Sequence, residues 1–320
     1  MLKYLIILLD DTSTSYCHYE NEKSERKLIA LEDLKSGILF AMKENLMIQF
    51  VYPDYELPQE YKDAIHTIDH SKIVPNKSME QGDVVVLNGW TDFNESLFEE
   101  ETAYVLRTKK DEFFKNHLLI KDALNKVVRL NVVFTDVDTF TDADFDIYKQ
   151  CLQLLVDEVE KLYISGKAPQ LNLLTDRMML TAMNNCNAGW ENVTLAPDGK
   201  FYVCPAFYQA DSKITIEDKA PSIGDLQQGL DIKNPQLYRL THAPLCRNCD
   251  AYQCKRCIWL NRKTTLEVNT PGHEQCVVAH LERNASRKLL ANIRKHGTFM
   301  PEVEIKEIEY LDPFDVRKEW

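Results

Sequence analysis

The stretch Cys246-Arg-Asn-Cys249-Asp-Ala-Tyr-Gln-Cys254-Lys-Arg-Cys257 places four thiols within twelve residues. Three more cysteines belong to the same ordered array, since Cys186 and Cys204 precede the stretch and Cys276 follows it. Thiolate sulfur is the preferred ligand of soft metal sites, which include iron–sulfur clusters and zinc. Because seven cysteines exceed the four ligands of one site, the array predicts two sites, or one complete and one incomplete site.

Composition limits the classes of protein to which the chain can belong. Its 320 residues suggest two domains or one large one, and a hydrophobic content of 44% is enough for a core in each half. The net charge of −12 argues against a nucleic acid partner, since phosphate binding requires clustered Lys and Arg. No basic patch for an anionic membrane stands out, so we expect no membrane partner.

The amino-terminal segment, residues 1–9, is apolar for only a few positions before Asp10 and Asp11. It is too short for the core of a signal peptide and far too short for a transmembrane helix. We therefore expect a cytoplasmic protein, in which reducing conditions disfavour a disulfide framework. The segment instead predicts a buried first strand.

Residues 1–165 alternate between short apolar runs, typical of buried strands, and stretches with helical spacing. We expect strands over 4–9, 47–52, 83–88, 103–107, 131–135 and 170–174, helices over 31–46 and 142–163, and mostly helix over 113–130. Thr141 is the expected N-cap of the last helix, and Cys151 on that helix is expected to be a small core residue. These repeated units predict an α/β fold with a parallel sheet, either open or curled into a partial barrel.

The character of the chain changes after Thr175. Two short apolar runs flank Pro197-Asp198-Gly199, which predicts a β-hairpin over 193–203. A cysteine-rich loop region is expected over 239–276, followed by a helix over 279–295. These features predict three parts: an α/β domain over 1–175, a cysteine-rich domain over 176–296 and a tail over 297–320.

The spacing of the cysteines favours iron–sulfur over zinc. Zinc sites built from two Cys-x2-Cys pairs usually separate the pairs by about 15–20 residues, whereas four residues separate them here. Closely spaced cysteines are more typical of a cubane cluster, whose ligands spread around a larger object. A zinc site also leaves Cys186, Cys204 and Cys276 unexplained.

The order of the cysteines resembles the SPASM domain, the C-terminal extension of many radical SAM enzymes that modify peptides and proteins. Cys186 is followed after twelve residues by Gly199, and four residues later by Cys204, as in the first half of that domain. In its second half the family usually has five and three residues within the cysteine group, where this chain has four and two. The resemblance covers about residues 180–285 and implies a hairpin with loops and helices.

The resemblance also implies two [4Fe–4S] clusters. The ligands of the first cluster are then Cys246, Cys249, Cys254 and Cys276. Three ligands of the second are then Cys186, Cys204 and Cys257. Many relatives take the fourth ligand from a cysteine just before the array, and residues 180–185 contain none. We hypothesise that the second cluster has an open iron that binds a substrate thiolate, or that it borrows a ligand from elsewhere.

Radical SAM enzymes hold their catalytic cluster with Cys-x3-Cys-x2-Cys after the first barrel strand, and this motif is absent from the chain. At the corresponding place, Ser13 and Glu20 stand at the outer cysteine positions and only Cys17 is left. The family's Gly-Gly-Glu segment is also missing, and residues 50–58 stand in its place. We therefore interpret the first half as a degenerate partial (β/α) barrel of radical SAM type that binds no S-adenosylmethionine.

The segment Leu9-Asp-Asp-Thr-Ser-x-Ser-x-Cys-His-Tyr19, with the SPASM-like end, resembles CXXX-repeat peptide maturases. Those proteins accompany a true radical SAM protein and a small cysteine-rich precursor peptide. The resemblance implies a non-catalytic iron–sulfur subunit in a heterodimer with a catalytic radical SAM subunit. The complex is expected to modify cysteines of a ribosomal precursor peptide by thioether cross-linking. Its auxiliary clusters would accept an electron, stabilise the loops or bind a substrate thiolate.

Two other functions stay open. A self-sufficient atypical radical SAM enzyme would use Ser13, Cys17 and Glu20, and the purified chain alone would then cleave S-adenosylmethionine. A zinc-stabilised protein-binding module would have no redox role. Such a protein would be colourless and would contain one or two zinc ions.

Overall fold

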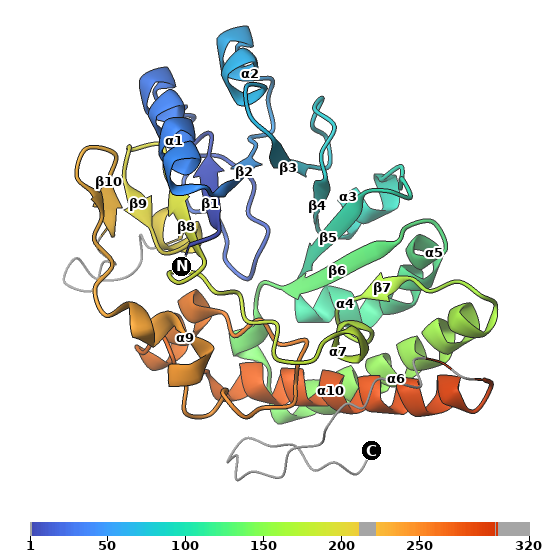
Figure 1. Cartoon of the computed structure of the whole chain (residues 1–320). Helices are drawn as coiled ribbons and strands as arrows, with labels where there is room; N and C mark the ends of the chain where they lie inside the picture. Colours follow the sequence, from blue (N-terminus) through green and yellow to red (C-terminus); the bar gives the residue numbers. More distant parts are fainter. Residues whose placement is uncertain (1, 211–221, 298, 300–320) are drawn as a thin grey trace. The chain divides into compact units, whose positions relative to one another are not determined.

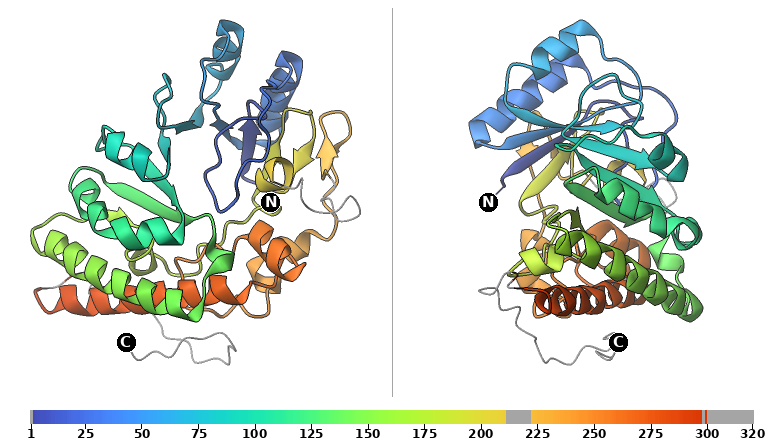
Figure 2. Two further views of the ribbon diagram at one scale, coloured as in Figure 1. Left: turned by 180° about the vertical axis from the view of Figure 1, so that it is seen from behind. Right: turned by 90° about the vertical axis from the view of Figure 1, so that its right-hand side faces the viewer.

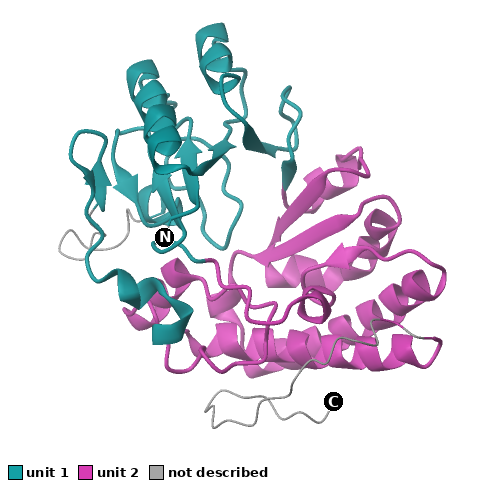
Figure 3. Ribbon diagram, in the orientation of Figure 1, with its two compact units in different colours: residues 1–86, 187–242 teal, residues 87–186, 243–320 magenta. Residues whose placement is uncertain are grey.

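The computed structural model describes residues 2–210, 222–297 and 299. The chain divides into two compact units, each built from two segments of the sequence (Figure 3). Unit 1 comprises residues 1–86 and 187–242, and unit 2 comprises residues 87–186 and 243–320. The nine strands of the main sheet pair mostly in parallel, which confirms the predicted α/β class.

Unit 1 is built around β1 (Tyr4–Leu8), which pairs in parallel with strands on both sides. Its part of the main sheet has the strand order β9-β8-β1-β2-β3-β4, in which β8 and β9 pair antiparallel. The other strands are β2 (Met47–Val51), β3 (His70–Pro75), the first part of β4 (Val84–Asn88), β8 (Asn192–Leu195) and β9 (Phe201–Tyr202). Leu5, Ile7 and Leu8 are fully buried, as expected for a strand covered on both faces. The predicted first strand and the predicted hairpin are both confirmed.

The helices of unit 1 are α1 (Leu31–Glu44), α2 (Gln59–Ile65) and the short α8 (Ala206–Gln209). Helix α1 buries Leu34, Ile38 and Ala41 and ends at Asn45, which adopts the left-handed conformation. Gly37 allows its close approach, because a Cβ atom there would clash with the Leu195 side chain. The unit also contains β10 (Gly224–Asp225), β11 (Gly229–Leu230), η4 (Pro235–Tyr238) and η5 (Leu240–His242).

Unit 2 contains the end of β4 and three further parallel strands, in the order β4-β5-β6-β7. These strands are β5 (Ala103–Thr108), β6 (Arg129–Phe134) and β7 (Gln170–Leu171). Between and after them lie α3 (Trp90–Glu95), α4 (Lys110–Asn116), η1 (His117–Leu119), α5 (Ile120–Leu124), η2 (Val137–Thr139), α6 (Asp142–Ile164) and α7 (Asp176–Met179). Thr141 caps α6 in a capping box with Asp144, as the sequence predicts for the N-cap.

The segment 113–130, expected to be mostly helix, is helical through α4, η1 and α5 up to Leu124, and the residues from Arg129 join the sheet. One secondary-structure prediction in unit 2 is wrong. The loop expected over 239–276 contains α9 (Ile258–Thr265), whose first four residues are all buried. The last helix, α10 (His273–Arg294), begins six residues before its predicted start and therefore includes Cys276.

Helices α6 and α10 lie side by side along unit 2 (Figures 1 and 2). Tyr148 on α6 donates its hydroxyl to Glu282 on α10 at 2.8 Å, and Asn292 donates to Glu160 at 2.9 Å. None of the described helices combines the length and the apolar character needed to cross a membrane.

The predicted three-part division of the chain stays a prediction. Its first boundary, at residue 175, lies within unit 2, and each unit combines an earlier and a later segment of the sequence. The predicted tail over 297–320 lies outside the described residues, apart from residues 297 and 299.

Candidate functional site

Four cysteines of unit 2 line one cavity, which we call the cysteine cavity. Three come from the loop between η5 and α9, and the fourth lies on the first turn of α10. They are Cys246, Cys249, Cys254 and Cys276. The structure thus brings together the four residues that the resemblance implies as ligands of one cluster. Their role as ligands stays a prediction.

Two of these sulfur atoms accept hydrogen bonds from the backbone two residues later. Ala251 N–H donates to Cys249 Sγ, and Arg256 N–H donates to Cys254 Sγ, each at 3.4 Å. Such bonds stabilise a thiolate more than a thiol, because they are charge-assisted. Burial acts in the opposite direction and raises the pKa of the Cys254 thiol. A thiolate at this position therefore requires positive charge nearby.

Buried arginines supply that positive charge. Arg177, Arg256 and Arg283 are each no more than 2% exposed. Arg177 and Arg283 both pair with the buried Asp250, at 3.4 and 3.0 Å. Arg256 lines the cysteine cavity, so a guanidinium group lies beside the thiols. Positive charge at this place suits an anionic group such as a thiolate-ligated cluster.

Arg256 is the arginine that lines the cavity itself. Its Nε donates to Asn185 Oδ1 at 2.6 Å, and this bond fixes the direction of the guanidinium group. Burial lowers the pKa of Arg256, whereas negative charge on Cys246, Cys186 and Cys254 raises it. The side chain therefore lies within electrostatic range of thiols from both predicted ligand groups.

Polar side chains also attach the loop that carries three of the cavity cysteines. Gln253, next to Cys254, donates its amide to Ala279 O at 2.7 Å and to Glu282 Oε2 at 3.4 Å. Glu282 also accepts the hydroxyl of Tyr148. Burial raises the pKa of Glu282 to about 7, so its neutral form is favoured in the folded protein at acidic pH. These bonds hold an irregular loop against the helices behind it.

One face of α10 completes the cavity. Gln275, Cys276, Ala279 and His280 line the cavity at helical spacings of three and four. Gln275 Oε1 is buried and has no hydrogen-bond partner within the described part of the chain. His280 is 1% exposed, and its Nε2 lies 3.6 Å from Cys249 Sγ. Sequence reasoning missed His280, although its four-residue spacing from Cys276 was a usable signal.

The other three cysteines of the array are divided between the units. Cys186 and Cys257 belong to unit 2, where Cys186 N–H donates to Lys255 O at 2.8 Å and Cys257 is the N-cap of α9. Cys204 follows β9 in unit 1. All three are half-buried. Their assignment to a second cluster stays a prediction.

The loop after β1 contains the three positions that correspond to a catalytic cluster site. Ser13 is fully buried, and its hydroxyl donates to Val51 O at 2.8 Å and accepts from Asp10 N at 3.0 Å. Cys17 is half-buried, and Glu20 is exposed. The Ser13 hydroxyl thus holds the ends of β1 and β2 together.

Two tyrosines donate hydrogen bonds to the two aspartates of this loop. These contacts were not predicted from the sequence. Tyr55 donates to Asp10 Oδ2 at 2.8 Å, and Tyr208 donates to Asp11 Oδ1 at 2.5 Å. Burial raises the pKa of both tyrosine hydroxyls, so they stay protonated and act as donors. Both aspartates of the loop therefore accept hydrogen bonds from tyrosines that lie outside it.

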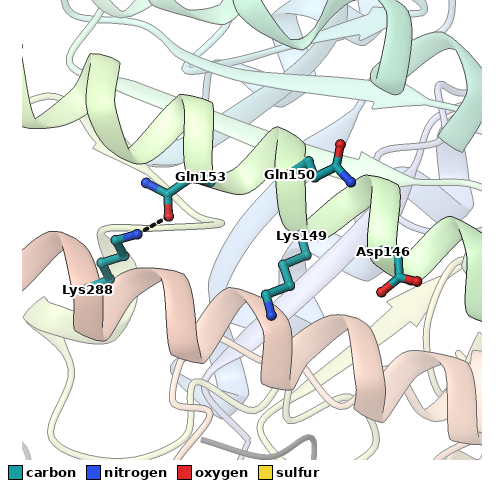
Figure 4. Close-up of a pocket in the computed structure, with 5 residues that line it drawn as sticks. All are labelled: Asp146, Lys149, Gln150, Gln153 and Lys288. Carbon is teal, nitrogen blue, oxygen red and sulfur yellow. Dashed lines mark hydrogen bonds between the residues drawn. The ribbon is translucent and has the colours of Figure 1, made fainter. Parts of the chain in front are cut away.

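Two other features of unit 2 offer no comparable set of ligands. Cys151 is 4% exposed on α6, and burial raises its pKa to about 11, which confirms it as a core residue. An open groove between α6 and α10 is lined by polar side chains without a thiol (Figure 4). Across residues 2–210, 222–297 and 299, no three His, Cys, Asp or Glu side chains converge closely enough to hold a single metal ion.

No protein-family model matches the chain, and no curated protein matches it. Among solved structures, hexahistidine-tagged anSMEcpe with bound AdoMet is similar with a TM-score of 0.59 at 10% identity, over 92% of this chain and 96% of that chain. Native anSMEcpe with bound AdoMet and Cp18Cys peptide is similar with a TM-score of 0.59 at 11% identity, over 92% of this chain and 100% of that chain. Streptococcus suis SuiB bound to precursor peptide SuiA has a TM-score of only 0.44 at 12% identity, over 79% of this chain and 70% of that chain.

At such low identity the similarity to anSMEcpe concerns the fold. It spans almost the whole of both chains, and both of those structures contain bound AdoMet. The chain therefore shares the fold of anSMEcpe.

Proposed function

We propose that the chain is an auxiliary iron–sulfur subunit of a heterodimeric radical SAM peptide maturase in the cytoplasm. Its partner, a catalytic radical SAM subunit, would hold the cluster that cleaves S-adenosylmethionine. This chain would carry two [4Fe–4S] clusters and help to position a cysteine-rich precursor peptide. The expected product is a thioether cross-link at a peptide cysteine.

The cysteine cavity is the observation that carries this proposal. Four thiols line it, backbone N–H groups donate to two of the sulfurs, and the guanidinium group of the buried Arg256 lines it beside them. The donor set therefore fits a thiolate-ligated cluster in both chemistry and charge. Such a cluster would supply an electron acceptor close to the peptide and would fold a loop that has little core of its own.

The loop after β1 supports the absence of a catalytic cluster from this chain. Ser13 uses its hydroxyl to bind the ends of two strands, Glu20 is exposed, and one thiol is left at Cys17. A serine, a glutamate and one cysteine make a poor ligand set for a cubane, which prefers thiolates. The radical would therefore originate in the partner subunit.

Two observations support the binding of a precursor peptide by this chain. One structure with this fold contains a Cp18Cys peptide. The second group, Cys186, Cys204 and Cys257, supplies three thiolates for a four-iron cluster. An iron without a protein ligand would bind a peptide thiolate, because iron prefers sulfur.

Co-expression tests the assignment of roles to the two subunits. The chain, the catalytic subunit and the precursor peptide are produced together, and the mass of the peptide is measured by mass spectrometry. Each thioether removes one thiol hydrogen and one carbon-bound hydrogen, so the cross-linked peptide is lighter by two hydrogens per link. We expect cross-links only when both subunits are present, and we expect the two subunits to co-purify.

Three results would contradict the proposal in different ways. Full cross-linking by the catalytic subunit alone would remove the need for this chain. Cleavage of S-adenosylmethionine by this chain alone would show a self-sufficient enzyme that uses the Ser13, Cys17 and Glu20 positions. Zinc in place of iron would instead support a binding module without redox chemistry.

A further inference from the structure

Helix α10 places a histidine next to one sulfur of the cysteine cavity. His280 is 1% exposed, and its Nε2 lies 3.6 Å from Cys249 Sγ. It follows Cys276 by four residues, so both side chains lie on the same face of the helix. One turn of α10 therefore brings a thiol and an imidazole to the same cavity.

The protonation states of the pair determine what the imidazole does. A cysteine that binds iron is a thiolate, so its sulfur can only accept a hydrogen bond. The hydrogen between the two atoms must then belong to His280 Nε2. Cys249 Sγ already accepts the backbone N–H of Ala251 at 3.4 Å. This sulfur therefore receives one N–H group from the backbone and one from a side chain.

Hydrogen bonds to the sulfurs are one of the factors that set the reduction potential of an iron–sulfur cluster. Reduction adds negative charge to the cluster and its sulfurs, so an N–H donor stabilises the reduced state more than the oxidised state. We propose that His280 is a positioning residue that donates Nε2–H to Cys249 and raises the reduction potential of the cluster in the cysteine cavity. This inference rests on the proposed function, because it requires a cluster bound there.

A redox titration of the anaerobically reconstituted full chain, followed by electron paramagnetic resonance, tests the inference. All proteins carry Cys204→Ala, which removes a predicted ligand of the other cluster and simplifies the signal. His280→Leu removes the donor at similar size, and we expect a more negative midpoint potential with unchanged iron and sulfide. His280→Gln offers an amide N–H, and we expect it to recover part of that shift.

A spectroscopic measurement identifies the bond directly. In protein with nitrogen-15 histidine, we expect a weak coupling between the label and the reduced cluster that disappears in His280→Leu. If His280→Leu loses iron, His280→Gln decides the question, because its amide carries no histidine label and the coupling should disappear in it as well.

Three results would overturn the role of His280, and only the last of them would also overturn the proposed function. An unchanged potential in His280→Leu at full iron content overturns the role of His280 and leaves the proposed function standing. Strong coupling, as from a nitrogen bound to iron, also overturns it, because His280 would then be a ligand. A wild-type chain with zinc or without iron overturns the proposed function, and the inference with it.

Discussion

The cysteine cavity of unit 2 and the loop after β1 of unit 1 are both built from buried polar residues on irregular backbone, but they use them differently. In the cavity, the polar residues next to the cysteines bind partners behind the loop, so that four sulfurs line one space. In the loop after β1, Ser13, Asp10 and Asp11 bind strand ends and tyrosines. The four thiols that line one cavity therefore distinguish the candidate site from the loop, and a high content of polar residues does not by itself make one.

The largest expected effect is the loss of a cluster from the cavity. We expect Cys254→Ala to lower the iron and sulfide content of anaerobically purified protein by about half, since one of two four-iron clusters loses a ligand. Cys151→Ala is the matched control, because that thiol lies in the α6 core. Full iron content in Cys254→Ala would show that the cavity is not a cluster site.

The second prediction concerns the buried charges behind the cavity. Asp250→Asn leaves Arg177 and Arg283 without their common carboxylate, and we expect the free energy of unfolding to fall by about 3–5 kcal/mol. Asp231→Asn, which breaks an exposed pair with Lys233, should cost no more than about 1 kcal/mol. Urea unfolding compares the two variants, and equal losses would contradict the importance of the buried charges.

The third prediction concerns the pH dependence of stability. The carboxyl of Glu282 has a pKa of about 7 in the folded protein and an ordinary value of 4.5. Between these values the folded state binds more protons than the unfolded state, so stability falls as pH rises from about 4.5 to 7. The contribution of this group is roughly 3 kcal/mol, from the difference between the two pKa values.

Urea unfolding across this pH range checks the contribution of Glu282. We expect Glu282→Gln to remove the fall, because the amide does not titrate. Glu158→Gln, which alters a surface pair with Lys161, should keep it. The same fall in wild type and Glu282→Gln would assign the pH dependence to other groups.

The smallest effect is expected in the loop after β1. Ser13→Ala removes the hydroxyl that donates to Val51 O and accepts from Asp10 N, and we expect a loss of about 1–3 kcal/mol in stability. Iron content should stay the same, because this position holds no cluster in our account. A drop in iron content would show that the loop after β1 also contributes to a cluster site.

Several features of the fold and the grouping of the cavity cysteines were predictable from the sequence, because particular residues signal them. The apolar run of β1, the Thr141 cap and the hairpin at Gly199 are local signals, and the structure contains all three features. The grouping of the cavity cysteines followed from a family resemblance in their order. It could not be derived from spacing alone, since spacing left zinc open.

What the sequence did not reveal depends on contacts between distant segments. Arg177 and Arg283 meet Asp250 only after folding, and an arginine in a sequence carries no sign of burial. His280 was missed because the predicted helix began after Cys276, which hid their common face. The end of the mostly helical segment over 113–130 was misplaced for a similar reason, since pairing with β5 draws Arg129 and the following residues into the sheet.

Iron and sulfide analysis of the anaerobically purified wild-type chain, combined with electron paramagnetic resonance, decides whether the chain carries two clusters and no catalytic one. We expect about eight iron atoms and about eight sulfides per chain, from two four-iron clusters. We also expect a spectrum that does not change when S-adenosylmethionine is added. A third cluster whose spectrum responds to S-adenosylmethionine would show that the chain is itself catalytic, and zinc without iron would show that it carries no cluster.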